Sequence, residues 1–223
     1  IDDGGALIGA DVTFAGAVAQ ATDSRITNSS GTFTVSGAVS GAFALYAGGA
    51  GNTTFGIAIP TAGLLLTKQG AGTLTVTGTN LNTGTIRIDA GTLTYGAATT
   101  LAAAPIIVTG GTFNMNATTD TVGAITLVGG TIANGTLTGA TAYTMESGTV
   151  SAVLAGAIAF VKNTNNTVTL TGANTMSSTT TINAGTLALS GSGSAVSTTI
   201  TVNLGGTLTL DNSTTAVASR LGD

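Results

Sequence analysis

A short tripeptide, glycine–threonine–apolar, recurs about every 20 residues along nearly the whole sequence. Self-similarity at a period of roughly 20–50 residues is typical of solenoids and other stacked arrays, so this repeat constrains the fold more than any other feature. Three weaker copies, starting at Ala10, Thr53 and Asn166, fill the gaps between the clear ones. The clear copies start at Gly31, Gly72, Gly91, Gly111, Gly130, Gly148, Gly185 and Gly206.

Two positions within each repeat are apolar and alternate with residues that are mainly threonine. This alternation is typical of a strand with one buried face. The position two after the start is apolar in every copy: Val12, Phe33, Phe55, Leu74, Leu93, Phe113, Ile132, Val150, Val168, Leu187 and Leu208. The position four after it holds Phe14, Val35, Ile57, Val76, Tyr95, Met115, Asn134, Ala152, Leu170, Leu189 and Leu210. Asn134 is either a local defect or a buried amide bonded to a neighbour, and the cost of an unsatisfied buried amide favours the second.

A second short strand is predicted before many copies, at residues 86–88, 106–108, 125–127 and 200–202. Glycine then turns the corner, where a positive φ or a close backbone approach is needed. No stretch has helix periodicity, which excludes a leucine-rich repeat with its returning helix. We therefore expect an all-β fold, a single right-handed parallel β-solenoid of about eleven coils. Residues 1–223 form one continuous solenoid in this prediction, a segment of a longer repetitive chain, since residues 219–223 look like the start of a further coil.

Composition excludes several classes of protein. The chain is 43% hydrophobic with a net charge of −4, whereas disordered chains combine low hydrophobicity with high net charge. Nucleic-acid binding needs a basic patch, and only five basic residues are scattered along the chain. No apolar run approaches the roughly 18 residues of a membrane-spanning helix. Charged residues make up only 6%, so neutral polar side chains must cover the surface.

Two stretches, residues 68–95 and 166–189, resemble the autotransporter-associated β-strand repeat. Both carry its glycine–threonine–apolar strand, followed by a second strand and another glycine. The family's aromatic position holds Asn82 in the first stretch and Met176 in the second, and the glycine kept as Gly84 is Ser178 in the second. The resemblance implies a β-solenoid, a bacterial cell-surface or extracellular location, and export through the outer membrane. It implies little about activity, which in such proteins usually resides in appended domains.

The sequence predicts no enzyme, and no catalytic, cofactor-binding or metal-binding residue. Histidine and cysteine are both absent, which removes serine and cysteine triads and most transition-metal sites. The acidic residues fall at differing offsets from the repeat start, so few share a face. Lys68, Arg87 and Lys162 are predicted to share one outward column, with Asp89 and Glu146 beside it. We interpret these charges as a solvated stripe rather than as a contact row for a partner.

The function expected is a structural rod, namely a stalk, an adhesin-type passenger or a fibre subunit. One alternative is ice binding through outward Thr-x-Thr pairs, an array interrupted at Asn114, Ala133, Ser151 and Ala188. Another is carbohydrate binding, which would need aromatic residues along one groove. The chain has Tyr46, Tyr95, Tyr143 and six phenylalanines, and the core already takes Phe14, Phe33, Phe55, Phe113 and Tyr95. We also expect self-association into filaments, or continuation into further repeats, because the end strands have unpaired edges and no capping helix.

Overall fold

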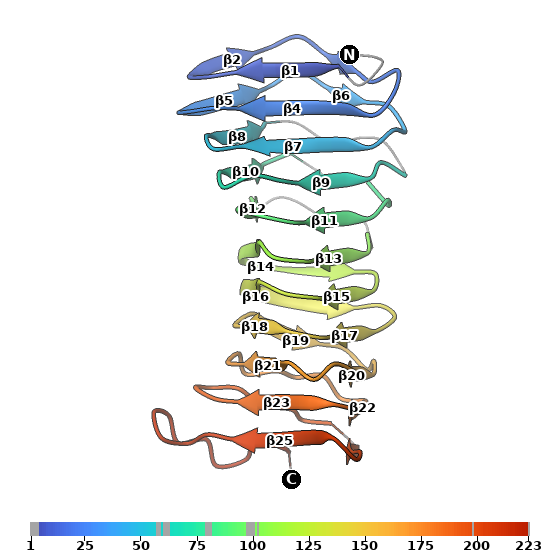
Figure 1. Ribbon diagram of the computed structural model, residues 1–223, viewed down its shortest axis with the longest axis vertical. Helices are drawn as coiled ribbons and strands as arrows, with labels where there is room; N and C mark the ends of the chain where they lie inside the picture. Colours follow the sequence, from blue (N-terminus) through green and yellow to red (C-terminus); the bar gives the residue numbers. More distant parts are fainter. Residues whose placement is uncertain are drawn as a thin grey trace.

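The computed structural model describes residues 5–56, 59, 63–78, 82–96, 101, 103–197 and 199–222. Within these ranges the chain forms strands and turns but no helix, and hence no helix suited to crossing a membrane. Successive coils of about 20 residues stack in parallel into a rod, with the two termini at opposite ends (Figure 1). The prediction of an all-β solenoid is confirmed.

One side of the rod is a parallel sheet, called here the first sheet, with one strand from every coil. Eleven strands stack in it among the described residues, which agrees with the predicted number of coils. The strands predicted at residues 86–88, 106–108 and 125–127 have those bounds. In stacking order the strands are β1 (Ala6–Gly9), β4 (Ser24–Asn28), β7 (Leu45–Gly49), β9 (Leu66–Lys68), β11 (Ile86–Ile88), β13 (Ile106–Val108), β15 (Ile125–Leu127), β17 (Tyr143–Met145), β20 (Phe160–Lys162), β22 (Thr179–Ile182) and β24 (Thr199–Val202).

The second sheet holds the glycine–threonine–apolar strands and faces the first across the interior. It also stacks one strand from every coil, in parallel. In order these are β2 (Val12–Phe14), β5 (Thr32–Val35), β8 (Asn52–Phe55), β10 (Thr73–Val76), β12 (Thr92–Tyr95), β14 (Thr112–Val122), β16 (Thr131–Gly139), β18 (Gly148–Val150), β21 (Thr167–Leu170), β23 (Gly185–Leu189) and β25 (Gly206–Leu210).

A third side closes each coil and is less regular. Near the N-terminal end it contains the paired strands β3 (Val18–Ala19) and β6 (Val39–Ser40). In the middle, β14 and β16 bend around the corner and continue along this side, where β19 (Val153–Ala155) pairs with β16. The bend in β14 falls at Asn116 and Ala117, which both have positive φ.

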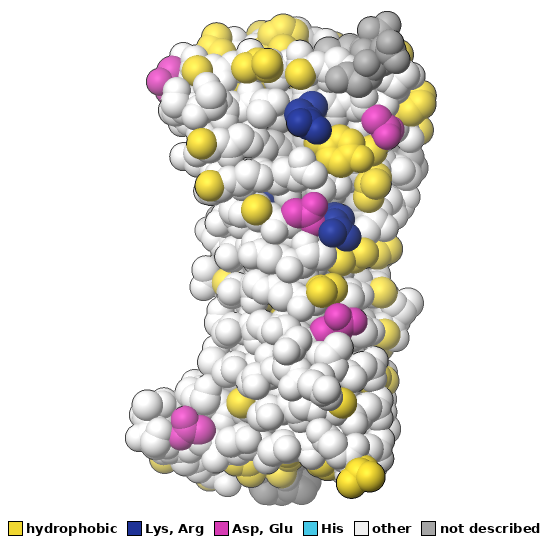
Figure 2. Space-filling view, viewed as in Figure 1, with side chains coloured by type: hydrophobic (Ala, Val, Ile, Leu, Met, Phe, Trp, Pro, Cys, Tyr) yellow, Lys and Arg dark blue, Asp and Glu magenta, His cyan; other side chains and the backbone are white. Residues whose placement is uncertain are grey.

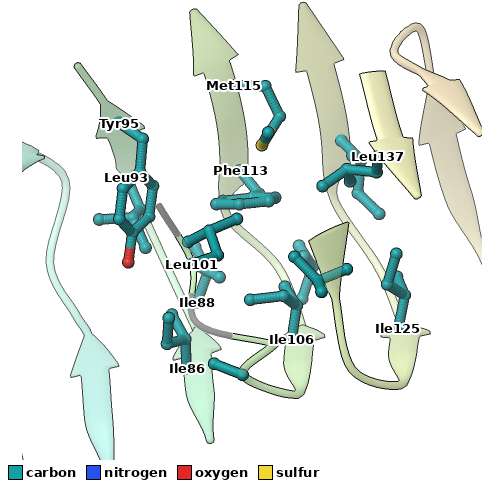
Figure 3. Close-up of a cluster of buried hydrophobic side chains, with 14 of the residues drawn as sticks. Ile86, Ile88, Leu93, Tyr95, Leu101, Ile106, Phe113, Met115, Ile125 and Leu137 are labelled. Atoms are coloured by element: carbon teal, nitrogen blue, oxygen red, sulfur yellow. The ribbon is translucent and has the colours of Figure 1, made fainter. Parts of the chain in front are cut away.

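The interior is filled by the predicted apolar columns. Figure 3 shows side chains from the three sides meeting there, among them Ile106, Phe113 and Leu137, all fully buried. The rings of Tyr95 and Phe113, from neighbouring coils, meet edge to face at 5.8 Å. Each buried aliphatic or aromatic side chain contributes about 1.5–3 kcal/mol relative to exposure. Because the same positions repeat in every coil, these contributions form one continuous core along the rod.

One weak copy of the repeat was aligned wrongly from the sequence. Its corner residue is Gly51 rather than Thr53, since a Cβ on Gly72 of the next coil would lie 1.9 Å from the carbonyl oxygen of Gly51. Thr53 therefore lies between Phe33 and Leu74 in the inward column. Phe55 takes the following inward position, and Ile57, which had been assigned to it, lies outside the described residues.

Asn134 is not a buried amide. It is exposed, and its Nδ2 donates to Oδ1 of Asn114 in the preceding coil at 3.1 Å. Asn134 and Gly135 both have positive φ, so the strand turns outward one residue after Ala133 instead of continuing inward. The predicted bond to a neighbour is present, but at the surface.

Besides the irregularity within the β14–β16 pair, the register of the second sheet shifts between β18 and β21. Val150 pairs with Leu170 rather than with Val168, and Val168 pairs with Gly148. The first sheet keeps its register at the same level, where Met145 pairs with Lys162. The shift by an even number of residues keeps every apolar side chain on the inner face, because side chains alternate with a period of two. The core therefore continues through the shift.

Thr53 provides a test of the corrected register. Its side chain is 2% exposed, and its hydroxyl oxygen has no hydrogen-bond partner among the described residues. A buried hydroxyl without a partner is destabilising, so Thr53→Val should raise the free energy of unfolding by about 1 kcal/mol, measured by urea denaturation. The matched control is Thr54→Val on the outer face of the same strand, with a change within about 0.5 kcal/mol. A loss of stability in Thr53→Val would contradict the alignment.

Candidate functional site

The outer face of the first sheet carries several charged side chains and one tyrosine, namely Arg25, Tyr46, Arg87, Asp89 and Glu146. One column runs through Arg25, Tyr46, Thr67 and Arg87 in successive coils. A second column consists of the residues that follow the inward-facing Ile26, Ala47, Lys68 and Ile88. It begins with Ile8 in the first coil and continues through Thr27, Gly48, Gln69 and Asp89.

Asp89 is held by two donors. The Nε atom of Arg87 donates to its Oδ1 at 2.6 Å, and the hydroxyl of Thr109 in the next coil donates to the same oxygen at 2.6 Å. As predicted, Glu146 follows the same column, three coils further along. Three strand spacings separate the two carboxylates by about 14 Å. Glycosidases place their carboxylates roughly 5–9.5 Å apart, so this pair does not fit that chemistry.

The same column continues toward the C-terminus as a ladder of asparagines. Nδ2 of Asn183 donates to Oδ1 of Asn163, and Nδ2 of Asn203 donates to Oδ1 of Asn183, both at 2.7 Å. Each amide thus bonds to the equivalent amide one coil away. These hydrogen bonds stabilise the corner at which successive coils turn. The amide groups are used for bonds within the ladder.

The prediction that Lys68 and Lys162 face outward is wrong. Lys68 pairs with the inward-facing Ile88, and Lys162 with the inward-facing Ile182; both lysines are at most 1% exposed. Arg87, the third residue assigned to this column, does face outward. Lys68 and Arg87 both precede their repeat glycine by four residues, but the corner after Lys68 is one residue longer than the corner after Ile88. One residue reverses the face on which a strand side chain lies.

The two lysines make equivalent hydrogen bonds. Nζ of Lys68 donates to the carbonyl oxygens of Gln69, Gly70 and Ala90 at 2.7, 2.8 and 3.1 Å. Nζ of Lys162 donates to the carbonyl of Thr164 and to that of Ala184 at 3.2 Å. In each case one acceptor is the carbonyl two residues after the lysine. Another is the carbonyl at the equivalent position in the next coil. The ammonium groups therefore satisfy carbonyls that the corners turn inward.

A third buried cation lies at the C-terminal end. Arg220 is 4% exposed, and its guanidinium donates to the carbonyls of Gly193 at 2.6 Å and Gly191 at 2.9 Å in the preceding coil. It also donates to the carbonyl of Asp211 and to the side chain of Asn212. Arg220 thus fixes the segment after β25 against the coil before it. This role could not be predicted from the repeat, because Arg220 has no equivalent arginine in the other coils.

Two of the three tyrosines are part of the interior. Tyr95 belongs to the core as predicted, and the buried hydroxyl of Tyr143 accepts a hydrogen bond from the amide of Gly139 at 2.8 Å. Tyr46 lies on the outer face of the first sheet and is half-buried. The guanidinium carbon of Arg25 lies 5.9 Å from the centre of its ring.

Threonines form two outward columns on the second sheet. Four adjacent coils contribute Thr32/Thr34, Asn52/Thr54, Thr73/Thr75 and Thr92/Thr94. Asn114 and Ala133 interrupt one column beyond these coils, and Ala188 interrupts the other. Among the described residues no group of three or more acidic, histidine or cysteine side chains is placed to hold a metal ion.

Comparison with protein families gives two matches within the chain. Residues 66–94 and 160–189 each match the model of the passenger-associated-transport-repeat. The chain carries two such repeats. No curated protein and no solved structure matches it. The matched stretches overlap the two that resembled the autotransporter-associated repeat, so this resemblance is confirmed.

The two passenger-associated repeats agree in structure as well as in sequence. Lys68 and Lys162 are each the third residue of a matched stretch, and they make the equivalent bonds described above. At the family's aromatic position, Met176 and Asn82 are both buried. Asn82 is tolerated there because its Nδ2 donates to the carbonyl of Leu64 at 2.7 Å and its Oδ1 accepts from the amide of Gly84 at 2.8 Å.

Burial of the two lysines should make stability depend on pH. It lowers the pKa of Lys68 to about 8, and it lowers the pKa of Lys162 while the negative charge of Glu146 acts in the opposite direction. An unfolded lysine keeps its proton up to about pH 10.4. Above pH 8 the unfolded chain therefore binds more protons than the folded chain, and the free energy of unfolding should rise with pH. Lys68 contributes at most roughly 2 kcal/mol of this rise between pH 8 and 9.5, and Lys162 adds to it in the same direction.

Urea denaturation at pH 7.5, 8.5 and 9.5 tests this dependence. Lys68→Met should remove part of the rise in the free energy of unfolding with pH. The double variant with Lys162→Met should remove most of the rest. Arg87→Gln, on the surface, should leave the rise intact. The series ends at pH 9.5 because burial raises the pKa of Tyr143, which makes stability fall above about pH 10. A flat profile in the unaltered protein would contradict the assignment.

Proposed function

We propose that the chain is a structural rod on the bacterial cell surface, part of an autotransporter passenger, and that it has no catalytic activity. The observation that carries this proposal is that most of the basic side chains hold the structure together. Three of the five basic residues, Lys68, Lys162 and Arg220, are buried and bonded to backbone carbonyls. Through these hydrogen bonds they hold neighbouring segments of the rod together.

The two passenger-associated repeats support the cell-surface location. A passenger that extends from a cell needs length and a continuous core rather than a globular active site. The stacked coils supply both, since each coil adds one strand spacing of about 4.8 Å to the length and one layer to the core. The low content of charged residues, 6%, also suits a surface whose contacts are mainly neutral.

Ice binding has weaker support. The two threonine columns lie side by side over only four adjacent coils, and one of these has Asn52 in place of threonine. Threonine is also a favourable residue on any exposed strand, so the columns need no special role to explain them. We therefore favour the rod.

Surface location can be tested on intact cells that produce the chain naturally. Added protease should degrade the chain or release it from the cells, and an antibody against it should label unpermeabilised cells. A cytosolic enzyme of the same cells, measured in parallel, should stay intact. Finding the chain in the cytosolic fraction and protected from protease would overturn the proposal.

We further propose that the ends of the rod join further coils, either end to end in other copies of the chain or in a continuation of the repeats. Both end coils expose inward-pointing apolar side chains, with Val12 at one end 49% exposed and Val202 and Leu210 at the other 46% and 49% exposed. The strands of the end coils also have an unpaired edge, which favours addition of a further strand. Joining unlike ends is a head-to-tail contact that does not close, and it therefore produces filaments.

Electron microscopy and light scattering of the purified 223-residue chain at tens of micromolar test this association. Filaments or large oligomers are expected for the unaltered chain. Leu210→Lys places a charge on the apolar end and should suppress them, whereas Thr209→Lys, on the outer face of the same strand, should not. A stable monomer over several days, without growth, would show that second copies do not cover the ends.

A further inference from the structure

A shallow groove lies on the outer face of the first sheet, in the half nearer the N-terminus. It has a volume of about 170 Å³ and is lined by Arg25, Thr27, Tyr46, Gly48, Gly49, Gln69 and Gly70. It forms where Gly48 leaves a gap in the column between Thr27 and Gln69. A Cβ on Gly48 would lie 2.2 Å from the carbonyl oxygen of Gln69, so the floor of the groove is bare backbone.

The walls of the groove carry three kinds of side chain with different binding chemistry. Arg25 supplies a guanidinium, Tyr46 an aromatic ring with a phenol, and Gln69 a primary amide. The close approach of coils explains the glycines, but it does not require arginine, tyrosine or glutamine beside them. These three residues therefore need an explanation other than packing.

Arg25 differs from the other basic residues of the chain. Among the described residues the one salt bridge joins Arg87 to Asp89, and the remaining basic residues other than Arg25 are buried. Arg25 is exposed and contacts the ring of Tyr46. On the face shown in Figure 2, basic side chains are few and lie in the N-terminal half, with hydrophobic surface close by. Arg25 is therefore a positive charge on the outer face of a chain whose net charge is −4, with Asp89 one coil beyond Gln69 in the adjacent column.

We propose that this groove binds the ring of a carboxylated sugar, such as a hexuronic acid. A guanidinium binds a carboxylate through two parallel hydrogen bonds, a geometry that a lysine does not provide. The ring of Tyr46 packs against the sugar's C–H groups, and the amide of Gln69 and the hydroxyl of Thr27 bind its hydroxyl groups. Arg25 shifts from the ring of Tyr46 toward the ligand, which costs little because an exposed cation–π contact is weak.

The size of the groove limits the ligand. Pockets for drug-sized molecules have volumes of roughly 300–1,000 Å³, and this groove is smaller. It therefore accepts one sugar ring, such as a terminal or side-chain residue of a polysaccharide. With one ion pair and few other contacts, a dissociation constant on the order of 1 mM is expected for a single ring. Copies of the site along a filament would strengthen binding to a polymer, although the single site does not depend on filament formation.

The test is ligand-observed NMR on the purified chain with two matched probes. Methyl β-glucuronide should bind, and methyl β-glucoside, which has the same ring without the carboxylate, should bind at least about tenfold more weakly. Arg25→Gln should weaken glucuronide binding about tenfold or more, and Tyr46→Thr should also weaken it. Raising the salt concentration from 20 to 300 mM should reduce binding, because the contact is an ion pair near the surface.

Controls separate this site from a general surface charge. Arg87→Gln changes an exposed arginine that already pairs with Asp89 and lies outside the groove, so binding should be unchanged. Acetate and inorganic phosphate should not compete at equal concentration, since they lack the ring. Equal binding of glucoside, equal loss in Arg87→Gln, full competition by acetate, or no glucuronide binding at 10 mM would each overturn the proposal. None of these outcomes bears on the proposed rod.

Discussion

The parallel hydrogen-bond ladder between coils is the constraint on which the rest of this structure depends. Each coil can satisfy its backbone groups only through the coil above and the coil below, as in the bond from the amide of Asp89 to the carbonyl of Lys68. A coil that left this register would expose its polar backbone to an apolar interior. Side chains at equivalent positions are therefore stacked, and the repeat in the sequence follows from this stacking.

The ladder works along strands but fails at corners, where carbonyls turn inward without a strand partner. Polar side chains supply the missing donors there. Nδ2 of Asn28 donates to the carbonyls of Gly31 and Asn52, much as the ammonium of Lys68 donates to those of Gly70 and Ala90. Burying a charge costs several kcal/mol unless it is well bonded. The lowered pKa of Lys68 reflects that cost, while its three carbonyl partners offset part of it.

The strands could be predicted from the sequence because their alternation has a period of two, and Ile86–Ile88 has the predicted bounds. The corners could not be predicted, because they differ by one or two residues between coils and a difference of one reverses the face of a side chain. Lys68 was placed on the wrong face for this reason. Thr53 was misplaced because its copy of the repeat, Gly51-Asn52-Thr53, has a polar residue at the inward position. Comparing Leu66-Thr-Lys68 directly with Ile86-Arg-Ile88 would have placed Lys68 in the column of Ile88.

The groove at Arg25 was beyond prediction from the repeat, because it results from how neighbouring coils differ. Gly48 creates the gap, and Arg25 and Gln69, from the coils on either side, line it. A solenoid that repeated perfectly would have no such place, since every column would be uniform from end to end. Specific recognition on a rod of this kind therefore requires departures from the repeat on the outer face, while the ladder and core keep the inner face regular. The column from Arg25 to Arg87 is where this chain departs most in charge and aromatic content.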